Sequence, residues 1–498
     1  MICDRKVRNF HSIESFLRRL VVVILLAILV GLIALHFGLV GTGHWAVDEF
    51  IVIRSYRDNG WSAFVDRLIT WSPRPISELL IWAYACLVNW QHKPFIGFSL
   101  ALLWLTLILA PLISFLQIRK PFSEHSRGSI LFFYLFAFAL IGFLLLGHNP
   151  GELFYWPIGA AAYLTTLSAI TVCFFQTALR LTESHTGRMI TSLTLIFAAG
   201  SSETGAFFAV VFGCLSLTGM AVDAVRGSYS ERKLFWCLVP VIVGIGIFGL
   251  LVQNRAQSQE AALAAAEYHN FYLSLKAALG QTINEYLVTG QRLSIHGVIL
   301  GLLLKACFFL GIRYCWLSTG IRSPRKQTLL VFALSIIATT YFSIAASYYA
   351  YGEATNDRHH ELRQCLIVLL ITIVALFSCH YHLPTFETPR LQWSGTIFVF
   401  VALVLVVPQR LNALKHDYRN YSACVENRRK SWNSGLSDGN TMIWYSPPPG
   451  RMVKAYLVEP GTYDLESNPP SRVMPLMHFF QKQRLEIRPF SNFQKGRN

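Results

Sequence analysis

The stretch LVVVILLAILVGLIALHFGLV, residues 20–40, decides the class of fold to which this chain belongs. Its length of about 20 predominantly apolar residues is enough for a helix to cross the hydrocarbon core of a membrane. Arg18 and Arg19 precede it, as basic residues precede the core of a signal peptide, but no small-residue cleavage pattern follows. We therefore predict an uncleaved first membrane helix.

Similar stretches recur along most of the chain. The 498 residues are 53% hydrophobic and only 14% charged, whereas soluble domains carry about 25% charged residues. Because a helix satisfies all of its own backbone hydrogen bonds, runs of this kind cross membranes as helices. We predict an all-α polytopic membrane protein. Its further apolar segments lie near residues 76–90, 95–116, 130–146, 156–179, 189–199, 204–222, 234–252, 295–312, 328–346, 362–378 and 393–407.

The basic connections between these segments predict the topology, because Lys and Arg gather in cytoplasmic loops. The N-terminus and residues 117–129, 180–188, 223–233, 313–327 and 379–392 are basic and are placed inside. The alternating connections, 41–75, 147–155, 200–203, 253–294 and 347–361, then lie outside together with the tail. Two apolar segments separate loop 41–75 from loop 117–129, so either segment 76–90 dips into the membrane without crossing it, which we favour, or the charge rule fails at 117–129. About 11 crossings plus this partial segment are expected, with 13 as the alternative.

The sequence also predicts two domains. Residues 1–407 form the transmembrane domain, with its first outer loop at 41–75. Residues 408–498 are rich in proline, glycine and mixed charges and contain strand-like runs such as TMIWY and RMVKAYLVE. They are expected to form a small α+β domain on the outer face. Within 253–294, an alanine-rich amphipathic run predicts an interfacial helix above the site.

Net charge and cysteine content exclude two other classes. The formal charge of +16, from 43 Lys and Arg against 27 Asp and Glu, lies in loops and forms no basic block with interleaved aromatic residues, so nucleic acid is not an expected partner. The basic loops are explained by anionic membrane lipid. The ten cysteines show no CxxC or Cys/His metal spacing, so we interpret them as small buried hydrophobic residues.

The acidic doublet Asp48–Glu49 opens the first outer loop and is the first candidate for chemistry. A carboxylate at a membrane surface can act as the general base for an acceptor hydroxyl, or help to hold a divalent cation such as Mg²⁺ or Mn²⁺. The alternative is helix capping, because acids favour the first turn of a helix.

Arginines in the outer connections are candidates for binding a phosphate. A guanidinium gives phosphate a fixed, bidentate partner, and Arg74, Arg255 and Arg358 have suitable positions in the sequence. The alternative for each is contact with the phosphates of ordinary membrane lipids.

Further polar and aromatic residues in the same connections are candidates for binding substrate. Ionisable groups at the ends of membrane segments are costly and therefore functional candidates. Aromatic rings suit stacking on a sugar, although an aromatic belt at the membrane interface explains them as well. The acids and the histidine are Glu78, Glu152, Glu203 and His359, and the aromatic residues are Tyr155, Trp156, Tyr163, Trp61 and Trp71.

Several short motifs resemble those of polytopic bacterial membrane glycosyltransferases. They are the acidic doublet after the first span, the element W-S-x-R-x-x-S at 71–77, FYWPIGAAAYL at 154–164, the turn SSETG at 201–205 and the late arginine loop. Together they are similar to the GT-C superfamily, and within it to the Gtr-type glucosyltransferases that modify O-antigen of lipopolysaccharide. Pro73 departs from the glycine of many relatives.

The resemblance implies a hexosyltransferase in the bacterial inner (plasma) membrane, with its N-terminus cytoplasmic and its C-terminus periplasmic. The implied donor is a polyprenyl-phosphate-linked sugar, and the implied acceptor is a cell-envelope glycan or lipid on the outer face. The family's acid corresponds to Asp48 or Glu49, and its arginine to Arg74. The alternative function is a lipid-glycan flippase or another membrane transporter, for which charges near the midplane and repeat symmetry are typical.

Overall fold

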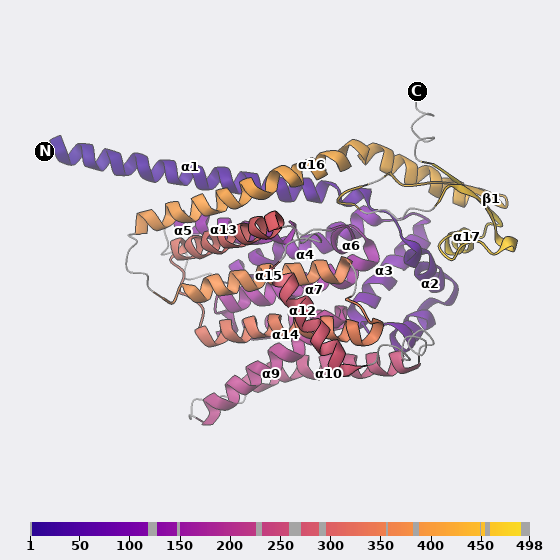
Figure 1. The fold of residues 1–498 in the computed structure, drawn as a ribbon, viewed down its shortest axis with the longest axis horizontal. Helices are drawn as coiled ribbons and strands as arrows, with labels where there is room; N and C mark the ends of the chain where they lie inside the picture. The colour runs from indigo at the N-terminus through magenta and orange to yellow at the C-terminus, as the bar shows by residue number, and fades with distance from the viewer. Residues whose placement is uncertain are drawn as a thin grey trace.

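The structure is a computed structural model that describes residues 2–117, 127–146, 150–225, 232–257, 270–287, 295–354, 357–381, 388–448, 450–453 and 459–489. It is a helical bundle with a small sheet at one end (Figure 1). Helix α1 (Ile2–Gly38) begins far from this sheet and ends close to it. The segments α2 (Val47–Asp66) and α3 (Pro75–Gln91) lie at the same end as the sheet, which we call the α2 end.

Eight helices of the described part are long and apolar enough to cross a membrane. This finding indicates an integral membrane protein. Helix α7 is the most deeply packed of them, because 89% of its most apolar 18-residue stretch is buried inside the protein. The eight are α1, α4 (Ile96–Leu116), α7 (Pro157–Ala178), α9 (Glu203–Val225), α13 (Ile295–Thr319), α14 (Lys326–Tyr351), α15 (Asp357–Ser378) and α16 (Thr388–Leu436).

The eight are fewer than the 11 to 13 crossings that the apolar segments predict. The helices of three predicted segments are not among the eight of the described part, namely α5 (Arg127–Leu144), α8 (His185–Ser201) and α10 (Arg232–Gln257). In the described part, the apolar stretches of α5 and α10 are Gly128–Leu144 and Trp236–Leu250. Helix α3, which has 17 residues, is also not among the eight.

Between α1 and α4 the chain folds into two short helices at the α2 end. Helix α2 contains a break at Gly60, whose φ of 58° lies in the left-handed region that glycine adopts without strain. A π-helical turn, η2 (Arg67–Trp71), then leads to Pro75, which begins α3. Proline favours the first turn of a helix because its fixed φ suits that position. Arg74 is therefore held at the junction between this turn and α3.

The C-terminal unit continues directly from α16, which runs without interruption through the predicted boundary at 407–408. Its three-stranded sheet has the order β1-β3-β2, with β1 parallel and β2 antiparallel to β3. The predicted strand TMIWY is confirmed as β1, whereas 451–453 of RMVKAYLVE form a bend and 454–458 lie outside the described residues. The unit comprises β1 (Thr441–Tyr445), β2 (Gly461–Asp464), α17 (Met474–Phe480) and β3 (Arg484–Arg488).

An aromatic cluster attaches this unit to the start of α2. The rings of Trp45 and Trp432 lie 4.9 Å apart, and those of Phe50 and Phe479 lie 5.5 Å apart. Arg57 of α2 donates a hydrogen bond of 2.9 Å to the carbonyl oxygen of Phe479. Edge-to-face ring pairs of this kind add to the stability that apolar burial provides. The C-terminal unit therefore supports the helix that carries the acidic doublet.

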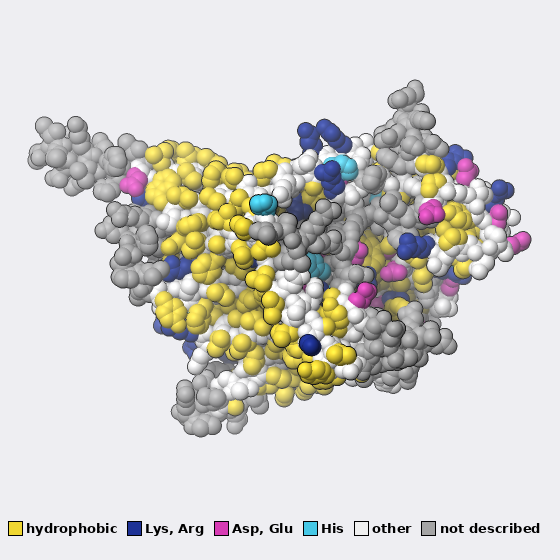
Figure 2. Space-filling view, viewed as in Figure 1, with side chains coloured by type: hydrophobic (Ala, Val, Ile, Leu, Met, Phe, Trp, Pro, Cys, Tyr) yellow, Lys and Arg dark blue, Asp and Glu magenta, His cyan; other side chains and the backbone are white. Residues whose placement is uncertain are grey.

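Hydrophobic and acidic side chains have different distributions over the molecule. Figure 2 shows hydrophobic side chains over most of the bundle, whereas acidic side chains on this face gather mainly at the α2 end. The remaining short elements are η1 (Val40–Thr42), α6 (Gly151–Phe154), η3 (Leu181–Glu183), α12 (Phe271–Leu287) and η4 (Leu465–Ser467).

Candidate functional site

An ion pair between Arg74 and Glu203 joins the start of α3 to the start of α9. Arg74 donates through Nε to Glu203 Oε1 at 3.0 Å, and its Nη2 contacts the same oxygen. The other carboxylate oxygen, Glu203 Oε2, is buried and has no hydrogen-bond partner among the described residues. A buried carboxylate oxygen without a donor is costly, so this atom is suited to accept a hydrogen bond from a ligand.

Tyr163 of α7 connects this pair to the first turn of α15. The guanidinium carbon of Arg74 lies 6.0 Å from the centre of the Tyr163 ring, and that of Arg358 lies 5.9 Å from it. The hydroxyl of Tyr163 is 3.0 Å from Nε2 of His359. Arg358 also lies 5.1 Å from the centre of the Trp156 ring. These distances bring together residues from four separate stretches of the sequence.

The local sequence explains why these side chains meet. Trp156 immediately precedes Pro157, which begins α7, and Tyr163 follows seven residues later, so both side chains lie on one face of the helix. Glu203 is the first residue of α9, and the hydroxyl oxygen of Ser202 accepts a hydrogen bond from the backbone N–H of Gly205. The ring contacts therefore bring the first turns of α7, α9 and α15 to one place. We call Arg74, Trp156, Tyr163, Glu203, Arg358 and His359 the arginine cluster.

Arg358 is the member of this cluster that has no anionic partner among the described residues. Within the described residues it makes no hydrogen bond or ion pair, and it is held only by the faces of Trp156 and Tyr163. Attraction between a cation and aromatic faces fixes the position of the guanidinium and leaves its N–H donors available. The N-terminal ends of helices add a partial positive charge. The cluster is therefore chemically suited to bind an anion such as phosphate.

The two acids of the doublet have different environments. Glu49 is buried; its Oε2 accepts a hydrogen bond of 2.8 Å from the backbone of Ala46 and its Oε1 one of 3.4 Å from Ile158. Burial raises the pKa of Glu49 to about 8. Asp48 is exposed and makes no hydrogen bond within the described part of the chain. Glu49 therefore fixes the start of α2 against the start of α7, while Asp48 is accessible to solvent.

The doublet does not fit a metal site. Both carboxylate oxygens of Glu49 accept hydrogen bonds from backbone N–H groups, and no group of three or more His, Cys, Asp or Glu side chains in the described ranges is placed to hold a metal ion. Divalent cations such as Mg²⁺ prefer carboxylates whose oxygens are free to coordinate. The expectation that Asp48 and Glu49 form a cation site is thus not supported by their geometry.

Glu78 and Tyr155 make structural contacts outside the arginine cluster. Glu78 binds Arg67 through two hydrogen bonds of 2.9 and 3.0 Å and accepts a third, of 2.8 Å, from the hydroxyl of Tyr56. It therefore ties α2 and the following turn to α3. Tyr155 is buried, and its hydroxyl donates to the carbonyl oxygen of His36 at 3.1 Å. Its side chain is directed to α1, although its neighbour Trp156 belongs to the cluster.

The other predicted residues are placed as follows. Glu152 is half-buried in α6 and has no hydrogen-bond partner among the described residues. Trp61 is 54% and Trp71 66% exposed, and Trp61 stacks on Phe64 of its own helix with ring centres 4.4 Å apart. Their exposure favours the aromatic-belt interpretation. Arg255 belongs to α10, but its side chain lies outside the described residues.

A buried ion pair that the sequence did not predict lies beside the cluster on α15. Arg363 donates to Glu285 of α12 through Nε at 2.9 Å and Nη2 at 2.8 Å, and Nδ1 of His360 lies 3.2 Å from the same carboxylate. Burial alone would raise the pKa of Glu285, but His360 and Arg363 lower it to about 2. Four basic residues occur within little more than one turn at the start of α15, namely Arg358, His359, His360 and Arg363. This spacing in the sequence indicates that several faces of α15 have polar partners.

No protein-family profile matches this chain, and a comparison with curated proteins found no significantly similar sequence. The geometry of the site therefore carries the functional argument.

Proposed function

We propose that this chain is a membrane glycosyltransferase that moves a hexose from a polyprenyl-phosphate-linked donor to a cell-envelope glycan or lipid. The observation that carries the proposal is Arg358, a cation without an ionic partner among the described residues, held against two aromatic rings beside the Arg74–Glu203 pair. A sugar phosphate at a membrane surface offers an anion and several hydroxyls. The arginine cluster supplies partners for both.

The donor phosphate would bind to Arg358, whose guanidinium can form two parallel hydrogen bonds with phosphate oxygens. A sugar hydroxyl would donate to Glu203 Oε2, the carboxylate oxygen that has no partner in the described structure. Arg74 would hold Glu203 in place and add positive charge near the phosphate. Positive charge at this position stabilises the phosphate as it leaves.

The transfer itself joins an acceptor oxygen to the anomeric carbon of the sugar while the bond from that carbon to the phosphate oxygen breaks. The polyprenyl phosphate departs with the electron pair. We assign to Asp48 the removal of the acceptor proton, because it is the exposed member of the doublet. Glu49 is a positioning residue that holds α2 against the start of α7. The α2 end would face the periplasm and the N-terminus the cytoplasm of the bacterial inner membrane.

The roles of the two acids can be tested with purified protein and a panel of polyprenyl-phosphate sugars, with envelope extracts as acceptors. Release of free polyprenyl phosphate should fall about 100-fold or more in Asp48→Asn, as is typical when a general base is removed. Glu49→Gln should lower the melting temperature, and any loss of turnover in this variant should follow from that loss of stability. Equal turnover in wild type and Asp48→Asn would remove Asp48 from the chemistry. Movement of labelled lipid-glycan across vesicles without donor turnover would favour the transporter.

A further inference from the structure

A second feature of the bundle, on another side of α15 from the arginine cluster, is a pocket of about 430 Å³ between α5, α13, α15 and α16. Its walls are mainly aliphatic and aromatic, and they include Phe143, Leu146, Leu304, Phe308, Val368 and Leu405. The arginine cluster and the pocket use different residues of α15. Arg358 and His359 contact α7, whereas Gln364 and Val368 line the pocket.

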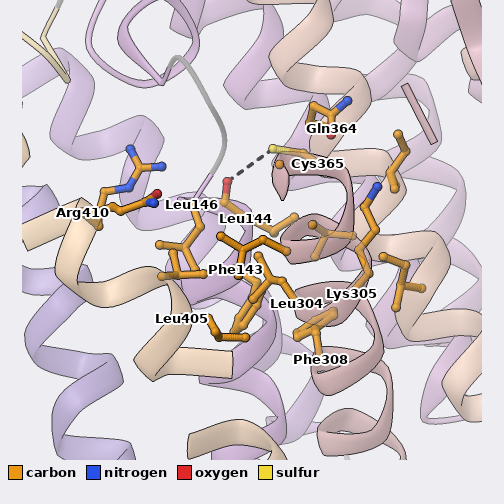
Figure 3. A pocket seen from close by; sticks show the side chains of 18 of the residues that line it. Phe143, Leu144, Leu146, Leu304, Lys305, Phe308, Gln364, Cys365, Leu405 and Arg410 are labelled. Atoms are coloured by element: carbon orange, nitrogen blue, oxygen red, sulfur yellow. Dashed lines mark hydrogen bonds between the residues drawn. The ribbon is translucent and has the colours of Figure 1, made fainter. Parts of the chain in front are cut away.

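Three cations border this apolar pocket. They are Lys305 of α13, Arg410 of α16 and Arg451 of the segment that follows β1, and the described residues that line the pocket include no Asp or Glu. Figure 3 shows Arg410 and Lys305 on opposite sides of the apolar side chains of Phe143 and Leu304. The charge of Glu361 acts on Arg410 from outside the lining. An apolar pocket with cations at its edge is complementary to an anionic amphiphile.

Lys305 lies deep in an apolar helix. It is nine residues into the candidate span His296–Thr319, or roughly 14 Å along the axis at about 1.5 Å per residue. Its Nζ donates a hydrogen bond of 2.6 Å to the backbone carbonyl of Tyr286. A lysine at such a depth is costly and is a candidate for function. Two further donor positions of the ammonium group can serve a ligand.

One wall of the pocket reaches the apolar surface of the bundle. Leu300, which lines it, is 39% exposed, and its neighbours Ile299 and Leu303 on α13 are 59% and 48% exposed. In a membrane protein, apolar side chains with this exposure face lipid chains. A long-chain ligand can therefore enter sideways from the bilayer, with its charged head reaching the cations.

We propose that this pocket binds a long-chain lipid monophosphate, with the chain against the apolar wall and the phosphate at one of the cations that border it, Lys305 or Arg410. It is a second lipid-phosphate site, separate from the arginine cluster. A monophosphate matches the observations because cations border the pocket on two sides and none of its described lining residues is acidic. The binding does not depend on sugar transfer, so the site stands or falls independently of the proposed function.

The test uses the full-length protein in nanodiscs and a polyprenyl monophosphate that carries a photoreactive group in its chain. In the wild type, cross-links should fall on peptides of α13, α15 and α16. Excess polyprenyl monophosphate should compete, whereas the corresponding polyprenol, inorganic phosphate and phosphatidylglycerol should compete at least about tenfold less well, as expected when a charge-assisted hydrogen bond or the chain is missing. Equal competition by polyprenol or phosphatidylglycerol would overturn the proposal.

Substitutions in the pocket test whether the labelled lipid binds there. The double variant Lys305→Met, Arg410→Gln should weaken labelling about tenfold or more, and Leu304→Trp should block it by filling the pocket. Arg419→Gln, an exposed arginine further along α16, is the matched control and should bind as the wild type does. Unchanged labelling in both pocket variants would contradict the site. Arg358→Gln should keep pocket labelling while losing donor turnover, so failure of one proposal can be distinguished from failure of the other.

Discussion

At the scale of single residues, Glu49 shows how burial changes the behaviour of a carboxyl group. Its side chain is fully buried with two backbone donors, and its pKa is raised from the ordinary value of 4.5 to about 8. Near neutral pH the folded protein therefore keeps a proton on Glu49 that the unfolded chain releases. By linkage, such a group makes the folded state less stable as pH rises from about 4.5 to about 8.

This difference predicts the pH dependence of stability. Thermal unfolding of the wild type and Glu49→Gln should be compared between pH 5 and pH 9. The wild type should lose stability relative to the variant as pH rises, by an amount on the order of a few kcal/mol at about 1.4 kcal/mol per pKa unit. A constant difference in melting temperature over this range would show that Glu49 does not bind the proton in the folded state.

The sequence could predict which residues belong to the arginine cluster better than it could predict their individual contacts. Arg74, Trp156, Glu203, Arg358 and His359 were candidates because polar and aromatic residues at the ends of apolar helices are costly to place there. The different environments of Asp48 and Glu49 were not predictable, because adjacent helical residues point in different directions and only packing decides which one is buried.

At the scale of elements, the turn between α6 and α7 depends on a glycine. A Cβ atom at Gly159 would lie 2.5 Å from the Trp156 ring and would also overlap the carbonyl oxygen of Glu152. The absence of a side chain therefore lets Trp156 lie against the first turn of α7. This contact places the ring over which Arg358 is held.

The contact at Gly159 gives a prediction with a built-in control. Gly159→Ala should destabilise the protein by about 1–3 kcal/mol, the usual cost of overpacking, and should change the tryptophan fluorescence. Gly246→Ala in α10 is the control, because the position that its Cβ would take lies in open space; it should be neutral or slightly stabilising. Equal effects of the two substitutions would contradict the role assigned to Gly159.

Helix α12 is attached to the bundle by the pair between Glu285 and Arg363, whose side chains are each 1% exposed. This contact joins residues 78 positions apart, and no local pattern in the sequence predicts it. Because the pKa of Glu285 is lowered to about 2, the pair contributes stability that is present above pH 4.5 and is lost as pH falls toward 2.

Removal of one partner should therefore release α12. Arg363→Met should lower stability by about 3–5 kcal/mol, since it leaves a buried carboxylate without its guanidinium, and hydrogen exchange should increase over Phe271–Leu287. Arg54→Met, which removes an exposed pair with Asp58, should change stability by less than about 1 kcal/mol. Unchanged exchange in α12 after Arg363→Met would show that other contacts hold this helix.

At the scale of the whole molecule, the apolar helices and the small C-terminal sheet were predictable from hydrophobic length and from the strand-like run TMIWY. Within the described residues eight helices are long and apolar enough to cross a membrane, and segments 130–146, 189–199 and 234–252 form helices that are not among them. The attachment of the C-terminal unit to α2 through Trp432 and Phe479 was not predictable, since ring contacts depend on the folded arrangement.

The position of α2 and the C-terminal sheet at the same end of the bundle predicts that both lie on one side of the membrane. In a variant whose native cysteines are replaced, among them Cys3 and the exposed Cys86 and Cys214, Asp48→Cys and Glu466→Cys should both react with an impermeant maleimide from the same face of sealed vesicles. The N-terminus should be accessible only from the other face, because α1 lies between it and Asp48. Labelling of positions 48 and 466 from opposite faces would contradict the shared α2 end.

The most direct test of the proposed function is donor turnover in proteoliposomes that carry the wild type, Arg358→Gln or Arg325→Gln. Arg325 is an exposed arginine that precedes α14 and pairs with Glu183, so it controls for the loss of a positive charge. We expect the wild type and Arg325→Gln to release polyprenyl phosphate from a sugar donor, and Arg358→Gln to be slower by about 100-fold or more, as when a transition-state charge partner is removed. Equal release by Arg358→Gln and the wild type, with the fold intact, would contradict the proposed function of the arginine cluster.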